Sequence, residues 1–381
     1  MRLLFFGTYD ASAHPRVAVL RDGLAGRGAT VLECNVPLGL TTAQRVGMLA
    51  HPAGLPLLAW RLARGWTGLI RRSRRFRRDG VDSQPDGVVV GYLGHFDVLL
   101  ARRLFPHVPV VLDHLVGASD TAADRGMGGG WRQALLRRLD AAALAAADVV
   151  VVDTEEHRDA LPVPARRRAV VVAVGAPLLW FDAYAGNGAG ARPPGAPLRA
   201  VFFGLFTPLQ GAPVIGEALS MLSGEPVEVT MVGSGQDLAE TRARVGANPA
   251  VRWVEWVEPA DLPQLVASHD VCLGIFGVGP KAARVVPNKV FQGAAAGCAL
   301  VTSDTGPQRR LLGDAALFVP PGDAAALAET LLSLAADPAR LAAARAAARA
   351  RARGSFPPAR GVGAGHAPRG PGRPPRPAGP G

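Results

Sequence analysis

The segment 279–297, which reads GPKAARVVPNKVFQGAAAG, contains Lys281 and Lys289, the only two lysines of the chain. Asn288 and Lys289 follow a proline where a helix is expected to begin, and Gln292 lies three residues further along the same helical face. An ammonium group suits a phosphate, and an amide suits a hydroxyl. The spacing therefore indicates a site for an anion and a hydroxyl. A solvated lysine on an exposed turn is the alternative that these residues alone leave open.

Two glycine turns between an expected strand and an expected helix mark further candidate positions. The stretch MVGSGQ contains Gly233 and Gly235, and the stretch FFGLFTPLQGAP contains Gly204 and Gln210. Glycine lets the backbone approach a ligand closely, but a tight turn also uses glycine for its geometry alone. We predict both turns at the binding site, and contact between their glycines and a ligand stays open.

Polar residues also follow expected strands in the N-terminal half. Asp10 and His14 lie after the first strand, and His114 and Asp120 lie after the strand VPVVL. The carboxyl ends of parallel strands meet at one edge of a sheet, so we expect these four side chains to face the ligand-binding cleft. Helix capping is an equally good explanation for each of them.

The elements that position these residues alternate between short apolar strands and amphipathic helices, which is typical of parallel sheets buried on both faces. This pattern occurs twice, so the sequence predicts an α/β fold with two Rossmann-like, doubly wound domains facing a central cleft. The predicted boundaries are an N-terminal domain over 1–184, a Gly/Pro-rich linker over 185–198, a second domain over 199–354 and a disordered tail over 355–381.

The net charge of +11 comes from two segments. Residues 61–79 hold eight Arg and one Asp, residues 355–381 hold four Arg and no acid, and the remaining chain has 30 basic and 30 acidic side chains. A folded body with balanced charge does not favour nucleic acid as a partner. The three cysteines lack the spacing of a metal site, and neither a signal peptide nor a membrane span is evident. We therefore expect a cytoplasmic protein.

The arginine-rich segment 60–78 interleaves its cations with aromatic residues, as a helix on an anionic membrane surface does. The predicted membrane contacts are Trp66, Arg71, Arg72, Arg74 and Arg75. A peripheral location on the inner face of the plasma membrane follows from this interpretation, and a plain solvated helix is the alternative.

Five stretches in order resemble the donor-binding half of group 1 glycosyltransferases, commonly called family 4, of the GT-B fold. They are FFGLFTPLQG, MVGSGQ, ADLPQLVASHDVCLGIFG, VPNKVFQGAAAGCALVTSDTG and LFVPPGD. The stretches FFGTYDASAHPRVAVLRDGL and DVVVVDTEEHRDAL resemble the acceptor half of the same enzymes.

This resemblance implies transfer of a sugar from a nucleoside diphosphate (NDP) sugar to an acceptor hydroxyl, with retained anomeric configuration, without a metal ion and without a cofactor besides the donor. A glycan or lipid-linked acceptor and a role in cell-envelope or polysaccharide assembly are also implied. By the same resemblance, Lys281 and Lys289 lie on the β-phosphate side, and the amides around Thr305 and Gly306 cap its oxygens. The resemblance also implies that the catalytic residues, which contact the transferred sugar, are among Asp10, His14, His114 and Asp120.

The chain departs from the family pattern at four positions. Arg284 and Gln292 stand where the family has a pair of glutamates, and Leu205 and Gln210 stand where it has an arginine and a lysine. A catalytically weakened homologue and a sugar-nucleotide epimerase or hydrolase of the same fold therefore remain alternatives. A nicotinamide-dependent oxidoreductase is not favoured, because no G-x-G-x-x-G turn follows the first strand.

Overall fold

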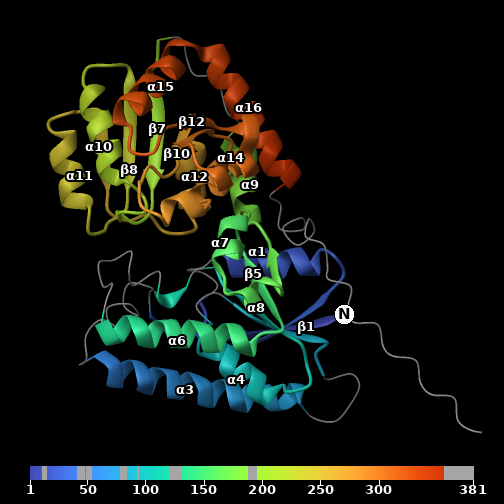
Figure 1. The fold of residues 1–381 in the computed structure, drawn as a ribbon. Helices are drawn as coiled ribbons and strands as arrows, with labels where there is room; N and C mark the ends of the chain where they lie inside the picture. Colours follow the sequence, from blue (N-terminus) through green and yellow to red (C-terminus); the bar gives the residue numbers. More distant parts are fainter. Residues whose placement is uncertain are drawn as a thin grey trace, which may run out of the picture.

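The computed structural model describes residues 1–10, 15–40, 48, 54–77, 84–91, 94–115, 117–119, 130–187 and 195–355. The chain forms two domains, and each contains a parallel sheet of six strands with helices on both faces (Figure 1). The prediction of an α/β fold with two Rossmann-like domains is therefore confirmed.

The N-terminal sheet has the strand order β2-β1-β3-β4-β5-β6. Its strands are β1 (Arg2–Gly7), β2 (Thr30–Asn35), β3 (Gly87–Val90), β4 (Val110–Asp113), β5 (Val149–Val152) and β6 (Ala169–Val171). Its helices are α1 (Pro15–Ala25), α3 (Leu55–Ser73), η2 (Arg74–Phe76), α4 (Asp97–Leu104), α6 (Gly130–Ala146), α7 (Glu155–Ala160) and α8 (Val163–Arg166). Side chains of β1 alternate between the two faces: Leu4 and Phe6 pack under α4, and Phe5 packs on the side of α1.

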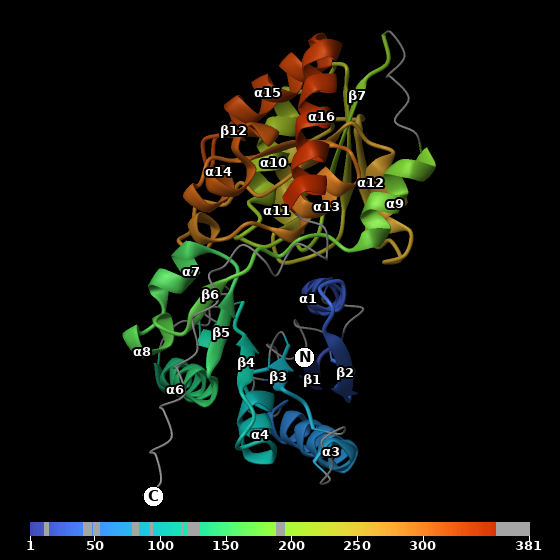
Figure 2. The ribbon, with the colours of Figure 1, turned by 90° about the vertical axis from the view of Figure 1, so that its right-hand side faces the viewer.

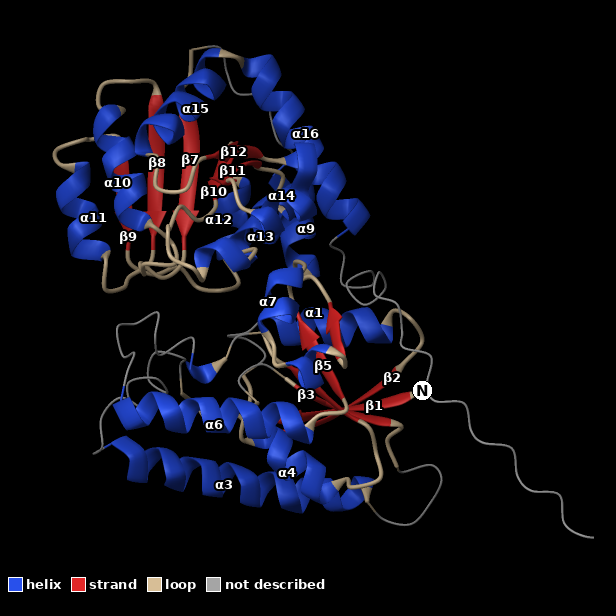
Figure 3. Ribbon diagram, in the orientation of Figure 1, coloured by secondary structure: helices blue, strands red, loops and turns tan. Residues whose placement is uncertain are grey.

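The C-terminal sheet has the strand order β12-β11-β10-β7-β8-β9 (Figure 3). Its strands are β7 (Leu198–Phe203), β8 (Val227–Val232), β9 (Val251–Val254), β10 (Val271–Leu273), β11 (Ala299–Ser303) and β12 (Leu317–Val319). Its helices are α9 (Leu178–Asn187), α10 (Ala212–Met221), α11 (Leu238–Val245), α12 (Leu262–Ala267), η3 (Ala282–Arg284), α13 (Asn288–Ala295), α14 (Gly306–Leu312), η4 (Gly313–Ala315), α15 (Ala324–Ala336) and α16 (Pro338–Ser355). Helices α10 and α15 cover one face of this sheet, and α9, α12, α13 and α16 cover the other.

Helix α9 belongs to the C-terminal domain, although the sequence-based boundary placed residues 1–184 in the N-terminal one. Trp180 is buried and stacks on Phe203 of β7 with ring centroids 5.6 Å apart. Figure 2 shows α9 beside α12, on the C-terminal sheet. The apolar side of α9 predicts burial, but it does not say which sheet it covers. Half of the predicted linker, residues 188–194, and nearly all of the predicted tail lie outside the described residues.

The carboxyl ends of the two sheets meet at the interface between the domains. Thr154, which follows β5, donates from Oγ1 to the carbonyl of Arg284 at 2.7 Å. Glu156 on α7 forms an ion pair with Arg310 on α14. Strand-end loops of both domains therefore face one another, as the predicted central cleft requires.

Helix α3 packs one face on the N-terminal domain and exposes the other. Leu69 is fully buried, and Trp66 packs against the core and donates from Nε1 to Asp97 Oδ1 at 3.0 Å. The ring of Trp66 therefore covers part of the domain's own core, and its membrane contact stays a prediction. Arg71, Arg72, Arg74 and Arg75 are exposed, and their contact with a membrane stays a prediction. No helix among the described residues has both the length and the apolar character to cross a bilayer.

Candidate functional site

The loops that follow β7, β8 and β10 come together at the point where the strand order of the C-terminal sheet reverses. Strand β7 lies between β8 and β10, and ligands of such sheets bind outside the carboxyl ends at this position. The amide of Phe206 donates to the carbonyl of Ser234 at 2.9 Å, and the amide of Phe276 donates to the carbonyl of Gln210 at 2.9 Å. The three loops therefore form one hydrogen-bonded platform.

The predicted glycines let these loops approach one another. A Cβ at Gly233 would lie 2.0 Å from the carbonyl oxygen of Gly204, and a Cβ at Gly235 would lie 2.3 Å from the carbonyl oxygen of Phe206. Both glycines also have positive φ, at 123° and 154°. Packing between loops thus explains both positions, and contact with a ligand stays a prediction.

Lys289 is buried at the reversal point, directly beneath the loop after β7. Its side chain is 4% exposed, and its Nζ lies 3.6 Å from the centre of the Phe202 ring. A Cβ built on Gly204 would lie 3.6 Å from the same Nζ. Lys289 is the second residue of α13, so the start of this helix places the ammonium under the end of β7.

Two buried polar atoms of this region have no hydrogen-bond partner. Within residues 195–355, the side-chain atoms in this condition are Lys289 Nζ and Gln210 Oε1. Both residues were predicted from the sequence to bind the ligand. An unpaired buried polar atom costs about 1–3 kcal/mol, and an unpaired charge costs more. Such a cost at two predicted positions of one site indicates that a polar ligand completes it.

Burial sets the charge of Lys289. It lowers the pKa of this ammonium from 10.5 to about 7, and the Cys272 thiol opposes the shift only weakly. Burial also raises the pKa of Cys272 to about 12, so the thiol is neutral and is no counter-ion. The site therefore holds a cation that is only half protonated near neutral pH and that an anionic ligand would recharge.

The other predicted residues of this domain lie around Lys289 with different surroundings. Gln292 is buried one turn further along α13, and Asn288 is exposed at its first position. Lys281 is half-buried at the start of η3. Thr305 precedes α14, and its Oγ1 accepts a hydrogen bond from Gln308 Nε2 at 3.2 Å. A Cβ at Gly306 would lie 3.2 Å from Glu156 Oε1, so the N-terminal domain reaches this helix end.

The N-terminal candidates are only partly described. His14 and Asp120 lie outside the described residues, and Asp10 follows β1 at a half-buried position. His114 follows β4 and is buried edge-on against His95, with ring centroids 5.3 Å apart. His95 was missed in the sequence, although it follows β3 and the rule that selected His114 applies to it as well. Asp113, just before His114, forms a buried ion pair with Arg16 at 2.7 Å.

Among the described residues, no group of three His, Cys, Asp or Glu side chains could hold a metal ion. The cationic and amide groups at the reversal point could instead neutralise and orient an anion.

Comparison with known proteins agrees with this geometry. Residues 197–337 match the family model described as "Glycosyl transferases group 1". This stretch contains all the predicted residues of the C-terminal site. A search of curated protein sequences found no match.

Nearly the whole chain is similar in fold to several solved structures. Sucrose-phosphate synthase from Thermosynechococcus elongatus superimposes with a TM-score of 0.65 at 16% identity, over 93% of this chain and 95% of the other. Alr3699/HepE from Anabaena, solved in complex with UDP, superimposes with a TM-score of 0.62 at 14% identity, over 94% of this chain and 95% of the other. The UDP-forming α,α-trehalose-phosphate synthase from Burkholderia vietnamiensis gives 0.60 at 14% identity over 93% of each chain.

The buried ammonium has a measurable cost. We expect Lys289→Met to stabilise the ligand-free protein at pH 6 and to stabilise it less at pH 9. The folded-state pKa of about 7 lies below the unfolded value of 10.5, so the native wild type gains stability as pH rises between the two. The variant lacks this gain. The difference in free energy of unfolding between the variant and wild type should therefore shrink by on the order of 2 kcal/mol from pH 6 to pH 9. Chemical denaturation at both pH values measures it.

Lys281→Met is the matched control, because it removes the other lysine of the same segment from a half-buried position. A stability difference between wild type and Lys289→Met that is the same at pH 6 and pH 9 would contradict burial of a titrating ammonium.

Proposed function

We propose that this chain is a group 1 glycosyltransferase of the GT-B type and that it transfers a sugar from a nucleoside diphosphate sugar to an acceptor hydroxyl. The observation that carries the proposal is the buried, unpartnered ammonium of Lys289 at the strand-order reversal of the domain that matches the family. Structures similar in fold have been solved with UDP and UDP-glucose, which makes uridine diphosphate the first nucleotide to test.

In the proposed reaction, the bond from the anomeric carbon of the donor sugar to the diphosphate oxygen breaks. A bond from the same carbon to the acceptor oxygen forms, and the diphosphate leaves with the electron pair of the broken bond. The proton of the acceptor hydroxyl passes to an oxygen of the departing diphosphate. Lys289 stabilises the negative charge that develops on this leaving group. The absence of a side chain at Gly204 leaves room for the ammonium and the diphosphate to meet.

The departures from the family pattern fit a site with fewer charges. Arg284 folds its side chain back, so that Nε donates to the carbonyl of Pro280 at 3.1 Å, and its own carbonyl accepts from Thr154. We propose that this position joins the domains instead of binding the donor. Gln210 and Gln292 would bind neutral donor groups, and Lys289 would carry the charge.

We also propose retention of anomeric configuration, independence of metal ions and a role in polysaccharide or cell-envelope assembly. These proposals rest on the resemblance of the five donor-half stretches to group 1 enzymes. Product analysis by NMR, with activity measured in the presence of EDTA, tests the first two. An inverted product, or loss of activity in EDTA that a divalent ion restores, would contradict them.

The assigned role of Lys289 predicts weaker binding of the donor when the ammonium is removed. We expect Lys289→Met to lower the affinity for UDP by about 10- to 100-fold, because one hydrogen bond to a charged group contributes about 1.5–3 kcal/mol. Isothermal titration calorimetry against UDP, GDP and TDP measures the effect and also identifies the base.

Arg309→Ala is the control for this experiment, and Lys281→Met is a second test of the site. Lys281 tests the second predicted cation, and Arg309 is an exposed cation of the same domain that pairs with Asp304. Equal affinity of Lys289→Met and wild type for every nucleotide diphosphate would reject the assigned role.

The exposed face of α3 supports a further proposal, that the protein docks on an anionic membrane surface. This helix lies on the side of the N-terminal domain away from the C-terminal domain (Figure 1). Leu57 and Trp60 are exposed near its start, and Arg71 and Arg74 are exposed near its end. Arg72 and Arg75 are also exposed, but they donate to the carbonyls of Asn35 and Glu33.

We expect the double variant Arg71→Ala/Arg74→Ala to bind vesicles of phosphatidylglycerol and phosphatidylcholine on the order of tenfold more weakly than wild type at low salt, because each cation near an anionic surface contributes about 1 kcal/mol. Co-sedimentation measures it, with Arg340→Ala/Arg353→Ala on the exposed side of α16 as the matched control. Equal loss of binding in both double variants, or binding to pure phosphatidylcholine, would contradict a specific docking face.

A further inference from the structure

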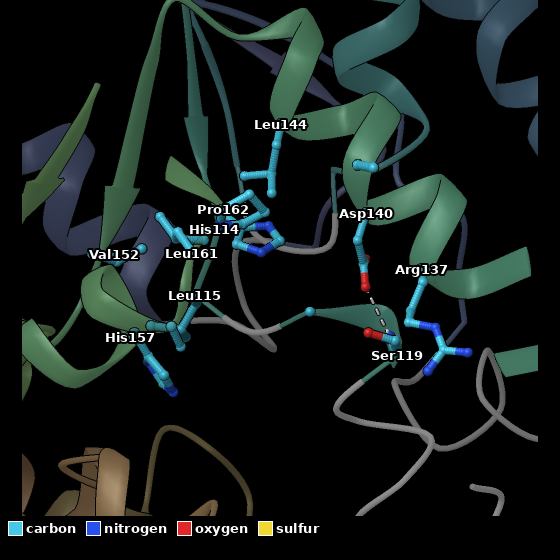
Figure 4. A pocket seen from close by; sticks show the side chains of 13 residues that line it. His114, Leu115, Ser119, Arg137, Asp140, Leu144, Val152, His157, Leu161 and Pro162 are labelled. Atoms are coloured by element: carbon cyan, nitrogen blue, oxygen red, sulfur yellow. Dashed lines mark hydrogen bonds between the residues drawn. The ribbon is translucent and has the colours of Figure 1, made fainter. Parts of the chain in front are cut away.

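A cavity of about 320 Å³ lies in the N-terminal domain, between α6 and the α7–α8 pair. Figure 4 shows Arg137 and Asp140 of α6 on one side of it, and His157 and Leu161 on the other. Apolar side chains line its wall: Ala141, Leu144, Val152, Leu161 and Pro162. The residues assigned above to the donor site do not line it, so this cavity is a separate feature of the molecule.

His114 lines the cavity with an unsatisfied ring. Its side chain is 8% exposed, and its Nδ1 is buried without a hydrogen-bond partner among the described residues. Burial, and in second place the neighbouring His95, lower the pKa of His114 to about 4. The ring is therefore neutral at pH 7, and it can donate a hydrogen bond to a hydroxyl or accept one from it. A ligand that supplies this bond would recover the cost of an unpaired buried nitrogen.

The free charge at the cavity is positive. The carboxylate of Asp140 accepts from the amides of Ala118 at 2.9 Å and Ser119 at 3.0 Å, and its Oδ1 lies 3.3 Å from His95 Nε2. Arg137 is exposed at the rim, and it forms no ion pair with a carboxylate of the described residues. A planar guanidinium binds phosphate and carboxylate groups through two parallel hydrogen bonds. The cavity thus offers an apolar wall, a neutral imidazole and one available cation.

Helix α7 connects this cavity to the donor domain. His157 of α7 lines the cavity, and its Nδ1 is held by Asp153. Glu156 of the same helix pairs with Arg310 and approaches Gly306. One short helix therefore forms a wall of the cavity and also contacts the C-terminal domain next to the predicted diphosphate site.

We propose that this cavity binds the acceptor, and that the acceptor is an anionic amphiphile whose phosphate or carboxylate group binds Arg137 while its apolar part covers Leu144 and Leu161. The acceptor role rests on the proposed function. The binding site itself rests on the cavity, on the unpaired His114 and on Arg137.

Octyl phosphate and phenyl phosphate are the probes, with inorganic phosphate and octyl glucoside as the probes that lack one of the two features. We expect both organic phosphates to bind at least tenfold more tightly than inorganic phosphate and octyl glucoside in calorimetry. Preference for octyl phosphate indicates a lipid-like acceptor, and preference for phenyl phosphate indicates an aromatic one. Equal affinity for all four probes, or no binding, would overturn the proposal.

Adjacent residues of α6 provide matched variants. Arg137 and Arg138 are both exposed, but only Arg137 lines the cavity. Ala141 and Ala142 are also both exposed, and only Ala141 lines the cavity. We expect Arg137→Ala and Ala141→Trp to weaken binding of the organic phosphates at least tenfold, and Arg138→Ala and Ala142→Trp to leave it unchanged. Equal effects within either pair would place the binding elsewhere and overturn the proposal.

UDP binding, measured on the same variants, separates this inference from the proposed function. If UDP binds to all four variants as to wild type and the organic phosphates show the expected pattern, both proposals are supported. If UDP binds but the organic phosphates do not, the cavity proposal falls and the proposed function stands. If UDP fails to bind while the organic phosphates depend on Arg137, the acceptor role falls together with the proposed function.

Discussion

The burial of one ammonium group without a counter-ion is the constraint on which the site depends. Lys289 lies beneath the end of β7, on the face of Phe202, where burial lowers its pKa to about 7. Burial of an unpaired ammonium destabilises the folded domain, because the cation–π contact with Phe202 offsets only part of the free energy that the ammonium loses when it leaves water. An anion bound beside Lys289 would make the arrangement favourable, and in the proposed function a diphosphate supplies this charge.

The remaining features of the C-terminal domain keep this ammonium in place beneath the strand-end loops. Gly204, Gly233 and Gly235 let two strand-end loops pack backbone to backbone, so the platform above Lys289 is formed by main chain instead of bulky side chains. The N-terminal domain contacts the same edge through Thr154 and Glu156. Because donor loops and α7 share one interface, an acceptor held beside α7 would be close to a donor held beside Lys289.

Periodicity was enough to predict both sheets, since each strand is a short apolar run between amphipathic helices. The position of Lys289 at a helix start was also predictable, because a lysine that follows a proline after a strand-end loop is a local feature. The domain to which α9 belongs was not predictable, because an apolar helix face can pack on either sheet. Only the contact between Trp180 and Phe203 assigns α9 to the C-terminal sheet. The orientation of Trp66 was missed for a similar reason: an aromatic residue among arginines suits a membrane as well as it suits the core. The cavity beside His114 joins α6, α7 and two strand ends, and no local pattern brings those together.

Direct titration of Lys289 tests the central claim. With only two lysines in the chain, carbon-13 lysine labelling gives two side-chain Cε signals, and the Lys281→Arg variant assigns them. The account predicts that the Lys289 signal titrates with a midpoint near pH 7 in the free protein and that saturating UDP moves this midpoint upward by at least about one unit. A midpoint of about 10 in the free protein, or a midpoint that UDP does not move, would contradict it.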